Sequence, residues 1–195
     1  KFYHRKLGIT LAFPKNWKID NLPTELIATT RTKYAVMQVT LEDLNKKRSP
    51  EEFIKAEFGE DLKAGEKIST ETYEGYTGIA VVNTPFGRQD TRIGVVFKDK
   101  QVFKFLATAK TPELMDQYDN EFISTISSLR ALKPEEDNLA EARRIKLIKA
   151  KEGDTFEKYA RSSPLTSYAA DQLRLINGLF PDGQPTPGEF VKIIQ

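Results

Sequence analysis

Apolar and polar side chains alternate with a period of two over much of residues 1–110, which is the pattern that half-buried β-strands produce. Two segments show it clearly, with apolar positions at Ile9, Leu11 and Phe13, and at Ala35, Met37, Val39 and Leu41. Two more pairs of alternating segments are each joined by a short turn, Glu74-Gly75 in one pair and Lys98-Asp99-Lys100 in the other. Each pair predicts a β-hairpin.

Two segments follow the period of a helix instead. Ser49, Pro50 and Glu52 have the spacing of an N-cap, a first helical residue and the acid of a capping box. A longer helix is predicted from residue 112, with one apolar face made of Met115, Tyr118, Phe122, Ile126 and Leu129. Strands with few helices predict an α+β domain over residues 1–130, an antiparallel sheet covered by helices.

The rest of the chain predicts a linker and a smaller domain. Residues 131–143 are mostly polar and charged, which favours a linker. Residues 144–195 read as strand, helix, helix and strand. Asp154 is expected to be the N-cap of the first helix, and Asn177-Gly178 ends the second, since glycine readily takes the left-handed conformation.

Composition narrows the class of protein. The chain has 195 residues, with 30 Lys and Arg against 28 Asp and Glu, so its net charge is only +2. Nucleic-acid binding needs a far more basic surface, so no nucleic-acid partner is expected. No apolar run approaches the roughly 20 residues of a membrane span. The absence of cysteine excludes disulfides and thiolate zinc sites. The chain begins at Lys1, and we expect it to be part of a longer protein.

The sequence contains few candidate catalytic residues and no catalytic motif that we recognise. His4 is the single histidine, and there is no HExxH motif, Walker loop or GxGxxG motif. Paired carboxylates could act as an acid and a base, but their places at a helix start, in a loop and in a linker strongly favour a structural or solvating role. Trp17 is expected to anchor the sheet face. We therefore expect no enzyme activity, no metal site and no cofactor in this chain.

The last 50 residues resemble LysM domains, the small βααβ modules that bind N-acetylglucosamine-containing glycans. The motifs are "KLIKAKEGDTFEKYA", "LRLINGL" and "PTPGEFVKII", in the family's order. The resemblance implies a sugar groove with two lips. Its glycan-binding residues would be Gly153, Asp154, Thr155 and Phe156 on one lip, and Gly178, Leu179 and Phe180 on the other. The longer loops "SSPLTSYAAD" and "FPDGQPTPGE" depart from the family pattern.

The first domain is similar to PsbP-like domains, through "LGITLAFPKNWKI". Such a domain followed by a LysM-like end resembles the C-terminal portion of bacterial zinc metallopeptidases related to the CAAX prenyl proteases. The resemblance implies a periplasmic or cell-envelope location, and zinc held by an HExxH domain elsewhere in the parent protein. It implies peptidoglycan, the parent's own catalytic domain or other envelope proteins as partners.

Two alternatives remain open from the sequence. The chain could be a protein–protein interaction module without glycan binding, with the expected groove occluded by residues 180–187 or by the first domain. It could also bind a small ligand in a pocket between the sheet and the helix at 112–129, which requires a cavity with convergent polar groups there.

Overall fold

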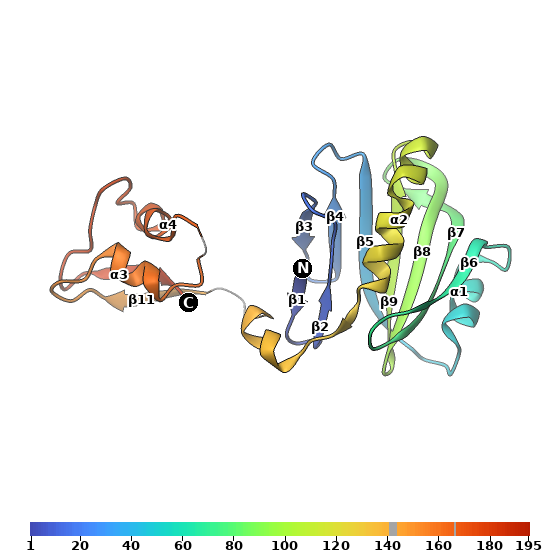
Figure 1. Ribbon diagram of the computed structural model, residues 1–195, viewed down its shortest axis with the longest axis horizontal. Helices are drawn as coiled ribbons and strands as arrows, with labels where there is room; N and C mark the ends of the chain where they lie inside the picture. Colours follow the sequence, from blue (N-terminus) through green and yellow to red (C-terminus); the bar gives the residue numbers. More distant parts are fainter. Residues whose placement is uncertain (141–143, 166) are drawn as a thin grey trace. The chain divides into compact units, whose positions relative to one another are not determined.

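The computed structural model describes residues 1–140, 144–165 and 167–195, and it divides into two compact units. The first unit is Lys1–Ala140 and the second is Glu141–Gln195 (Figure 1). Each unit has its own apolar core, so each is described by itself.

A seven-stranded antiparallel sheet forms the body of the first unit, in the order β3-β4-β5-β9-β8-β7-β6 (Figure 1). Its strands are β3 (Lys18–Asn21), β4 (Glu25–Thr29), β5 (Ala35–Asp43), β6 (Lys63–Ser69), β7 (Glu74–Thr84), β8 (Gly87–Lys98) and β9 (Gln101–Ala109). The alternation predicted from the sequence is present in β5, where Ala35, Met37 and Val39 are buried and their neighbours are half-buried. The predicted α+β class with an antiparallel sheet is confirmed.

A second, smaller sheet closes the first unit. It consists of β1 (Phe2–His4), β2 (Ile9–Leu11) and β10 (Arg130–Ala131), in the order β1-β2-β10. Because β10 follows the long helix and pairs with β2, the two ends of the unit are joined by hydrogen bonds.

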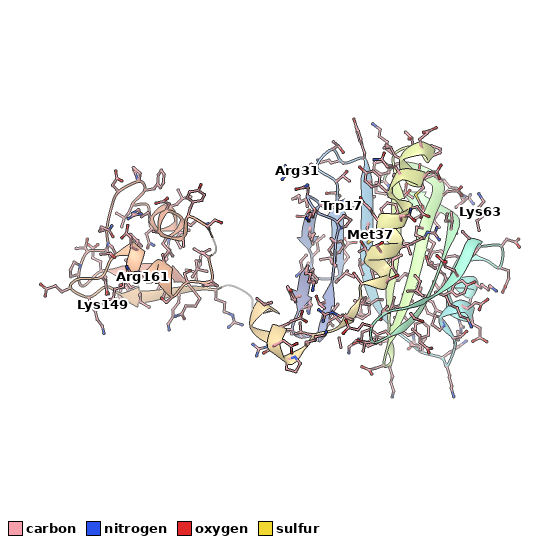
Figure 2. The ribbon with its side chains drawn as sticks, in the orientation of Figure 1. Trp17, Arg31, Met37, Lys63, Lys149 and Arg161 are labelled. Carbon is pink, nitrogen blue, oxygen red and sulfur yellow. The ribbon has the colours of Figure 1, made fainter. Side chains whose placement is uncertain are left out.

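The long helix α2 (Pro112–Ser127) packs on one face of the large sheet, against β5, β8 and β9 (Figure 1). Thr111 caps it, and its buried side chains include Met115, Phe122 and Ile126, as the helical spacing predicts. Trp17 packs edge-on against the rings of Tyr118 and Phe122 at 5.9 and 6.1 Å. Trp17 and Met37, both labelled in Figure 2, belong to this core, as expected for an anchor of the sheet face.

The short helix α1 (Pro50–Phe58) packs elsewhere on the sheet, against β7 and β8. The predicted capping box is present: the Ser49 side chain accepts from Glu52 N, and the Glu52 carboxylate accepts from Ser49 N at 2.7 Å. Phe53 and Ile54 join Ile93, Val95 and Val102 in a separate apolar cluster. This cluster covers only part of that side of the sheet.

One predicted turn is wrong by a few residues. The first hairpin turns at residues 70–73, since Ser69 pairs with Glu74. The Thr70 hydroxyl accepts hydrogen bonds from Thr72 N and Tyr73 N and so forms the turn. Gly75 lies inside β7, where an added Cβ would stand 2.5 Å from Val95 O. The glycine marks a close approach between strands and not a turn. The hairpin with Asp99 at its tip is confirmed by the pairing of β8 with β9.

The expected linker at 131–143 is largely bound to the first unit. Residues Pro134–Ala140 form a 3₁₀ helix, and Leu132 N donates to Gly8 O. The buried Arg130 donates to both carboxylate oxygens of Glu136 at 2.7 and 2.8 Å, and this contact lowers the pKa of Glu136 to about 2. Glu136, one of the charged residues that suggested a linker, therefore forms an ion pair with the first unit. Residues 141–143 lie outside the described part of the chain.

The second unit has the order β11 (Ile145–Lys149), α3 (Phe156–Arg161), α4 (Ala169–Ile176) and β12 (Phe190–Ile194). This is the strand–helix–helix–strand order that the sequence pattern predicts. The strands pair antiparallel, with Ile148 opposite Val191. Phe156, Leu173 and Ile193 form the buried centre of the core, and Gly178, with φ of 71°, follows α4 as predicted.

Candidate functional site

The turn before α3 is held by the Asp154 carboxylate. That carboxylate accepts from Lys151 N at 2.9 Å, from the Tyr159 hydroxyl at 2.5 Å and from Lys158 Nζ at 2.7 Å. These donors hold the pKa of Asp154 well below its usual range, the Lys158 ammonium contributing most. Burial, with Asp154 beside it, raises the pKa of Tyr159 to about 12. The turn is thus locked in one conformation.

The N-cap of α3 is Thr155 and not Asp154, one residue later than predicted. The Thr155 hydroxyl accepts from Lys158 N at 3.1 Å. Asp154 instead accepts from Lys151 N, three residues before it, so its side chain closes the turn and Thr155 starts the helix. Both side chains therefore have structural partners already.

Phe156 is completely buried and lies in the core of the second unit. Its ring is therefore not available to a ligand in this conformation. Its backbone N–H donates to Gln184 Oε1 at 3.0 Å. This places a side chain from the loop after α4 at the N-terminus of α3.

The other predicted lip follows α4 directly. Gly178 is exposed, Leu179 packs partly against the core, and Phe180 is 59% exposed. Leu179 N donates to Arg174 O, and Gly183 N donates back to Leu179 O at 2.8 Å. The loop thus folds over Leu179 and leaves Phe180 pointing into solvent.

A polar network that the sequence did not predict joins the first turn of α3 to α4 and to the loop after it. The buried Arg174 bonds to the Glu157 carboxylate, to Asp171 Oδ1 at 3.0 Å and to Gly183 O at 3.2 Å. Gln184 Nε2 donates to Glu157 Oε2 at 3.1 Å. A usable signal was present, because Arg174 stands on the inner side of α4 beside Leu173, where a cation needs an acidic partner.

We call residues 153–155 and 178–180 the loop rim. An added Cβ at Gly153 or at Gly178 would meet no atom within 4 Å, so open space lies beside both glycines. Both have positive φ, 78° and 71°, which only glycine adopts freely. The loop rim therefore offers exposed backbone and one exposed aromatic ring, that of Phe180, on a surface made rigid by the Arg174 network.

Acid should destabilise the second unit through this same network. The pKa of Glu157 is lowered from 4.5 to about 2, by its own backbone N–H and then by Arg174, and that of Asp154 is lowered as well. A carboxylate whose pKa is lower in the folded state than in the unfolded state stabilises the fold. Its contribution is complete at a pH above the ordinary pKa, here 3.8 for Asp154 and 4.5 for Glu157. The contribution is lost as the pH falls through the folded-state pKa.

The measurement for this prediction is thermal unfolding of the full chain between pH 7 and pH 2, followed at amides of residues 144–195 by NMR. The melting temperature should fall steadily below about pH 4.5. In Glu157→Gln the same fall should be smaller, because one of the two titrating groups is gone. An identical pH dependence in the variant would contradict the role given to Glu157.

The described residues between the sheet and α2 in the first unit are closely packed. Phe122 and Ile126 are buried there, and an added Cβ at Gly94 would stand 2.7 Å from Ile126 Cδ1. The small-ligand pocket considered from the sequence is therefore absent at that place. A cavity of about 470 Å³ lies elsewhere on the sheet, lined by side chains of β4, β5, β7, β8 and β9, none of them from α2.

The described residues form neither a metal-ligand cluster nor a membrane-spanning helix. Residues 1–140, 144–165 and 167–195 contain no group of three or more His, Cys, Asp or Glu side chains placed to hold a metal ion. In the same part of the chain, no helix has the length and apolar character needed to cross a membrane.

Comparisons with known proteins bear on the fold. No protein-family model matches the chain, and no curated protein matches it. Among solved structures, it is similar to cyanobacterial PsbP (CyanoP) from Synechocystis sp. PCC 6803, with 14% identity and a TM-score of 0.50 over 67% of this chain and 90% of that one. The structure thus contains a PsbP-like α+β fold, as the sequence resemblance implied.

A second solved structure comes from Bacteroides thetaiotaomicron VPI-5482. It matches with 11% identity and a TM-score of 0.49, over 83% of this chain and 57% of that one. This chain therefore spans only 57% of the length of that protein. At these identities the likeness concerns the fold alone.

Proposed function

We propose that this chain is a non-catalytic accessory region of a larger zinc-dependent metalloprotease, and that its second unit tethers that protein to peptidoglycan or a similar N-acetylglucosamine-containing glycan. The observation that carries the proposal is the loop rim, which joins two glycines with open space beside them to the exposed ring of Phe180. Glycan recognition needs such a surface, since sugars stack on exposed rings and hydrogen-bond to fixed polar groups.

In this proposal Phe156 is a core residue, and the contacts to sugar come from the loop rim. Backbone groups of residues 153–155 and 178–180 form the hydrogen bonds, and Phe180 supplies the stacking face. The first unit binds substrate or partner proteins, and the region works in the periplasm or cell envelope. The parent's zinc and its catalytic residues lie in the HExxH domain, outside this chain.

Phe180→Ala should weaken binding to peptidoglycan at least about fivefold, because an exposed aromatic contact contributes on the order of 1 kcal/mol. Phe190→Ala is the matched control, because Phe190 is 71% exposed on β12 of the same unit, outside the loop rim. The measurement is cosedimentation of the full chain with purified peptidoglycan. Equal loss in both variants, or loss in neither, would count against the rim as the glycan site. Thr155 is a poorer target because its replacement also removes the α3 cap.

A second candidate function has an observation in its favour. The Gln184 side chain accepts the hydrogen bond of Phe156 N, at the N-terminus of α3, and Gly183 packs against Leu179. The loop 180–187 therefore partly fills the space between the lips. This arrangement suits a protein–protein interaction module without glycan binding. Gln184→Ala discriminates between the two functions, because it frees the Phe156 N–H. If the loop blocks a groove, peptidoglycan binding should be stronger in the variant than in the original chain. If the loop rim is already an open glycan site, binding should not increase.

The parentage rests on the resemblance of both halves of the sequence to envelope metallopeptidases. The full gene sequence tests it directly. An HExxH motif in the longer protein is the expected result, and a gene without a metallopeptidase domain would overturn the parentage while leaving the tethering proposal open to its own test.

A further inference from the structure

The cavity on the large sheet has the size and lining of a small-molecule site. Its volume is about 470 Å³, within the range of roughly 300–1,000 Å³ typical of ligand pockets. It exists because α1 covers the sheet only near Ile93, Val95 and Val102. The neighbouring area, over β4, β5 and β9, is walled by the end of the β7–β8 hairpin instead.

The body of the cavity is apolar. Ile27 on β4 and Leu106 on β9 both lie opposite Gln38 of β5, and Val36 lies two residues before Gln38 on the same face of β5. Val82 and Phe86, from the β7–β8 hairpin, complete the lining. These side chains are half-buried, so a ligand would remove their remaining apolar surface from water.

Most polar groups in the lining are already used by the protein. The Thr91 hydroxyl donates to Gln89 O, the Thr108 hydroxyl to Asp90 O, and the Thr84 hydroxyl to Gly87 O. They leave no hydroxyl hydrogen for a ligand. The central part of the cavity therefore favours a hydrocarbon chain or ring.

Two free donors, one of them charged, lie at one end of the cavity. Thr29 ends β4, and Lys33 follows in the turn to β5, whose shape is fixed by hydrogen bonds from Tyr34 N and Ala35 N to the Thr30 hydroxyl. Within the described residues, the Lys33 ammonium and the Thr29 hydroxyl have no hydrogen-bond partner. Arg31, labelled in Figure 2, adds positive charge to the same turn.

The opposite end has the opposite character. Glu25 lies four residues before Thr29 on β4, about 13 Å along the strand. Its carboxylate accepts a hydrogen bond from the Gln38 side chain. A negative group would be repelled there, so the charge arrangement fixes one orientation for an anion, with its head at Lys33.

We propose that this cavity binds an amphipathic monocarboxylate, with the carboxylate at Lys33 and Thr29 and the hydrocarbon chain on the apolar lining. The site lies in the first unit and is independent of the glycan proposal, because it shares no residue with the loop rim. It would make this region a sensor or carrier of an acyl-type ligand in addition to a tether.

The test is titration of the ¹⁵N-labelled full chain with decanoate below its micelle concentration. Saturable shifts should appear at amides of β4, β5 and β9 and of residues 82–84 and 86. Lys33→Glu should weaken the affinity about tenfold or more, since it removes a charged hydrogen bond and adds repulsion. Lys67→Glu is the control, because Lys67 is exposed on the edge strand β6 and undergoes the same charge change.

Two further experiments test the role of the carboxylate and the location of the site. Decyl alcohol, which has the same chain without the charge, should bind at least about tenfold more weakly than decanoate. Thr29→Trp should fill the cavity and abolish the shifts while the rest of the spectrum is retained. Absent or non-saturating shifts, equal binding of the alcohol, or equal effects of Lys33→Glu and Lys67→Glu would each overturn the proposal.

Discussion

Replacing Asp119 with Ala should lower the free energy of unfolding of the first unit by about 3 kcal/mol. Arg92, on β8, is only 2% exposed, and its Nε and a terminal nitrogen donate to the two oxygens of Asp119 on α2 at 2.8 and 2.5 Å. Its other terminal nitrogen donates to Ala64 O at 3.3 Å. Without the carboxylate, the buried cation loses its charged partner, keeps only the Ala64 carbonyl and stays desolvated, which is why the cost is large.

Urea unfolding at pH 7, followed by the fluorescence of Trp17, measures this cost. Trp17 is the single tryptophan and lies in the first unit against α2, so it reports that unit alone. Asp116→Ala is the control, an exposed acid on the same helix, and should change stability by no more than about 0.5 kcal/mol.

A double variant separates the ion pair from simple packing. Arg92→Met with Asp119→Leu removes both charges and should restore most of the stability lost in Asp119→Ala, since apolar replacement of a buried pair is often neutral. If Asp119→Ala behaves like Asp116→Ala, the pair does not hold α2 on the sheet as described.

Phe156→Ala should unfold the second unit while the first stays folded. Truncating a fully buried phenylalanine costs about 3–5 kcal/mol, and a domain this small rarely has more stability than that. Phe156 packs at the centre of the only core cluster found among the described residues of this unit, with Leu173 and Ile193.

An ¹⁵N spectrum of the full chain shows the outcome. Amide signals of residues 144–195 should lose their dispersion in Phe156→Ala, and the Trp17 unfolding transition should not change. Phe180→Ala should keep the dispersed spectrum, because that ring is exposed. A well-dispersed second unit in Phe156→Ala would show that the ring is dispensable to the core and would return it to the candidate binding surface.

Local sequence pattern was sufficient for the elements whose residues contact the core periodically. The alternation of Ala35, Met37 and Val39 and the spacing of Met115, Phe122 and Ile126 each state directly which side of an element is buried. The capping box at Ser49 is local as well, since its partners are three residues apart. These features predicted the α+β sheet and its helices.

Features set by contacts between distant residues were not predictable in this way. Gly75 resembles a turn residue, yet it is required by the approach of Val95 O from the next strand. The ion pair of Arg130 with Glu136 binds residues 131–140 to the first unit. From composition alone, this segment looks like a polar linker. Local signals also placed the N-cap of α3 one residue too early.

The candidate site shows the same division. Gly153 and Gly178 could be placed in turns from sequence, because their left-handed conformation is a local requirement. The hydrogen bond of Gln184 to Phe156 N joins residues 28 positions apart, and no local pattern reports it. For the same reason the sequence placed a possible pocket under α2, where packing closes it, and not at the area that α1 leaves uncovered.

The most direct test of the central claim is an ¹⁵N titration of the full chain with chitin oligomers and soluble peptidoglycan fragments. A glycan tether at the loop rim predicts saturable shifts confined to residues 153–155 and 178–180, with the first unit unaffected. Shifts that are absent at millimolar sugar, or that are spread over both units, would contradict a glycan tether and leave the loop rim as a turn and helix cap within a protein-interaction module.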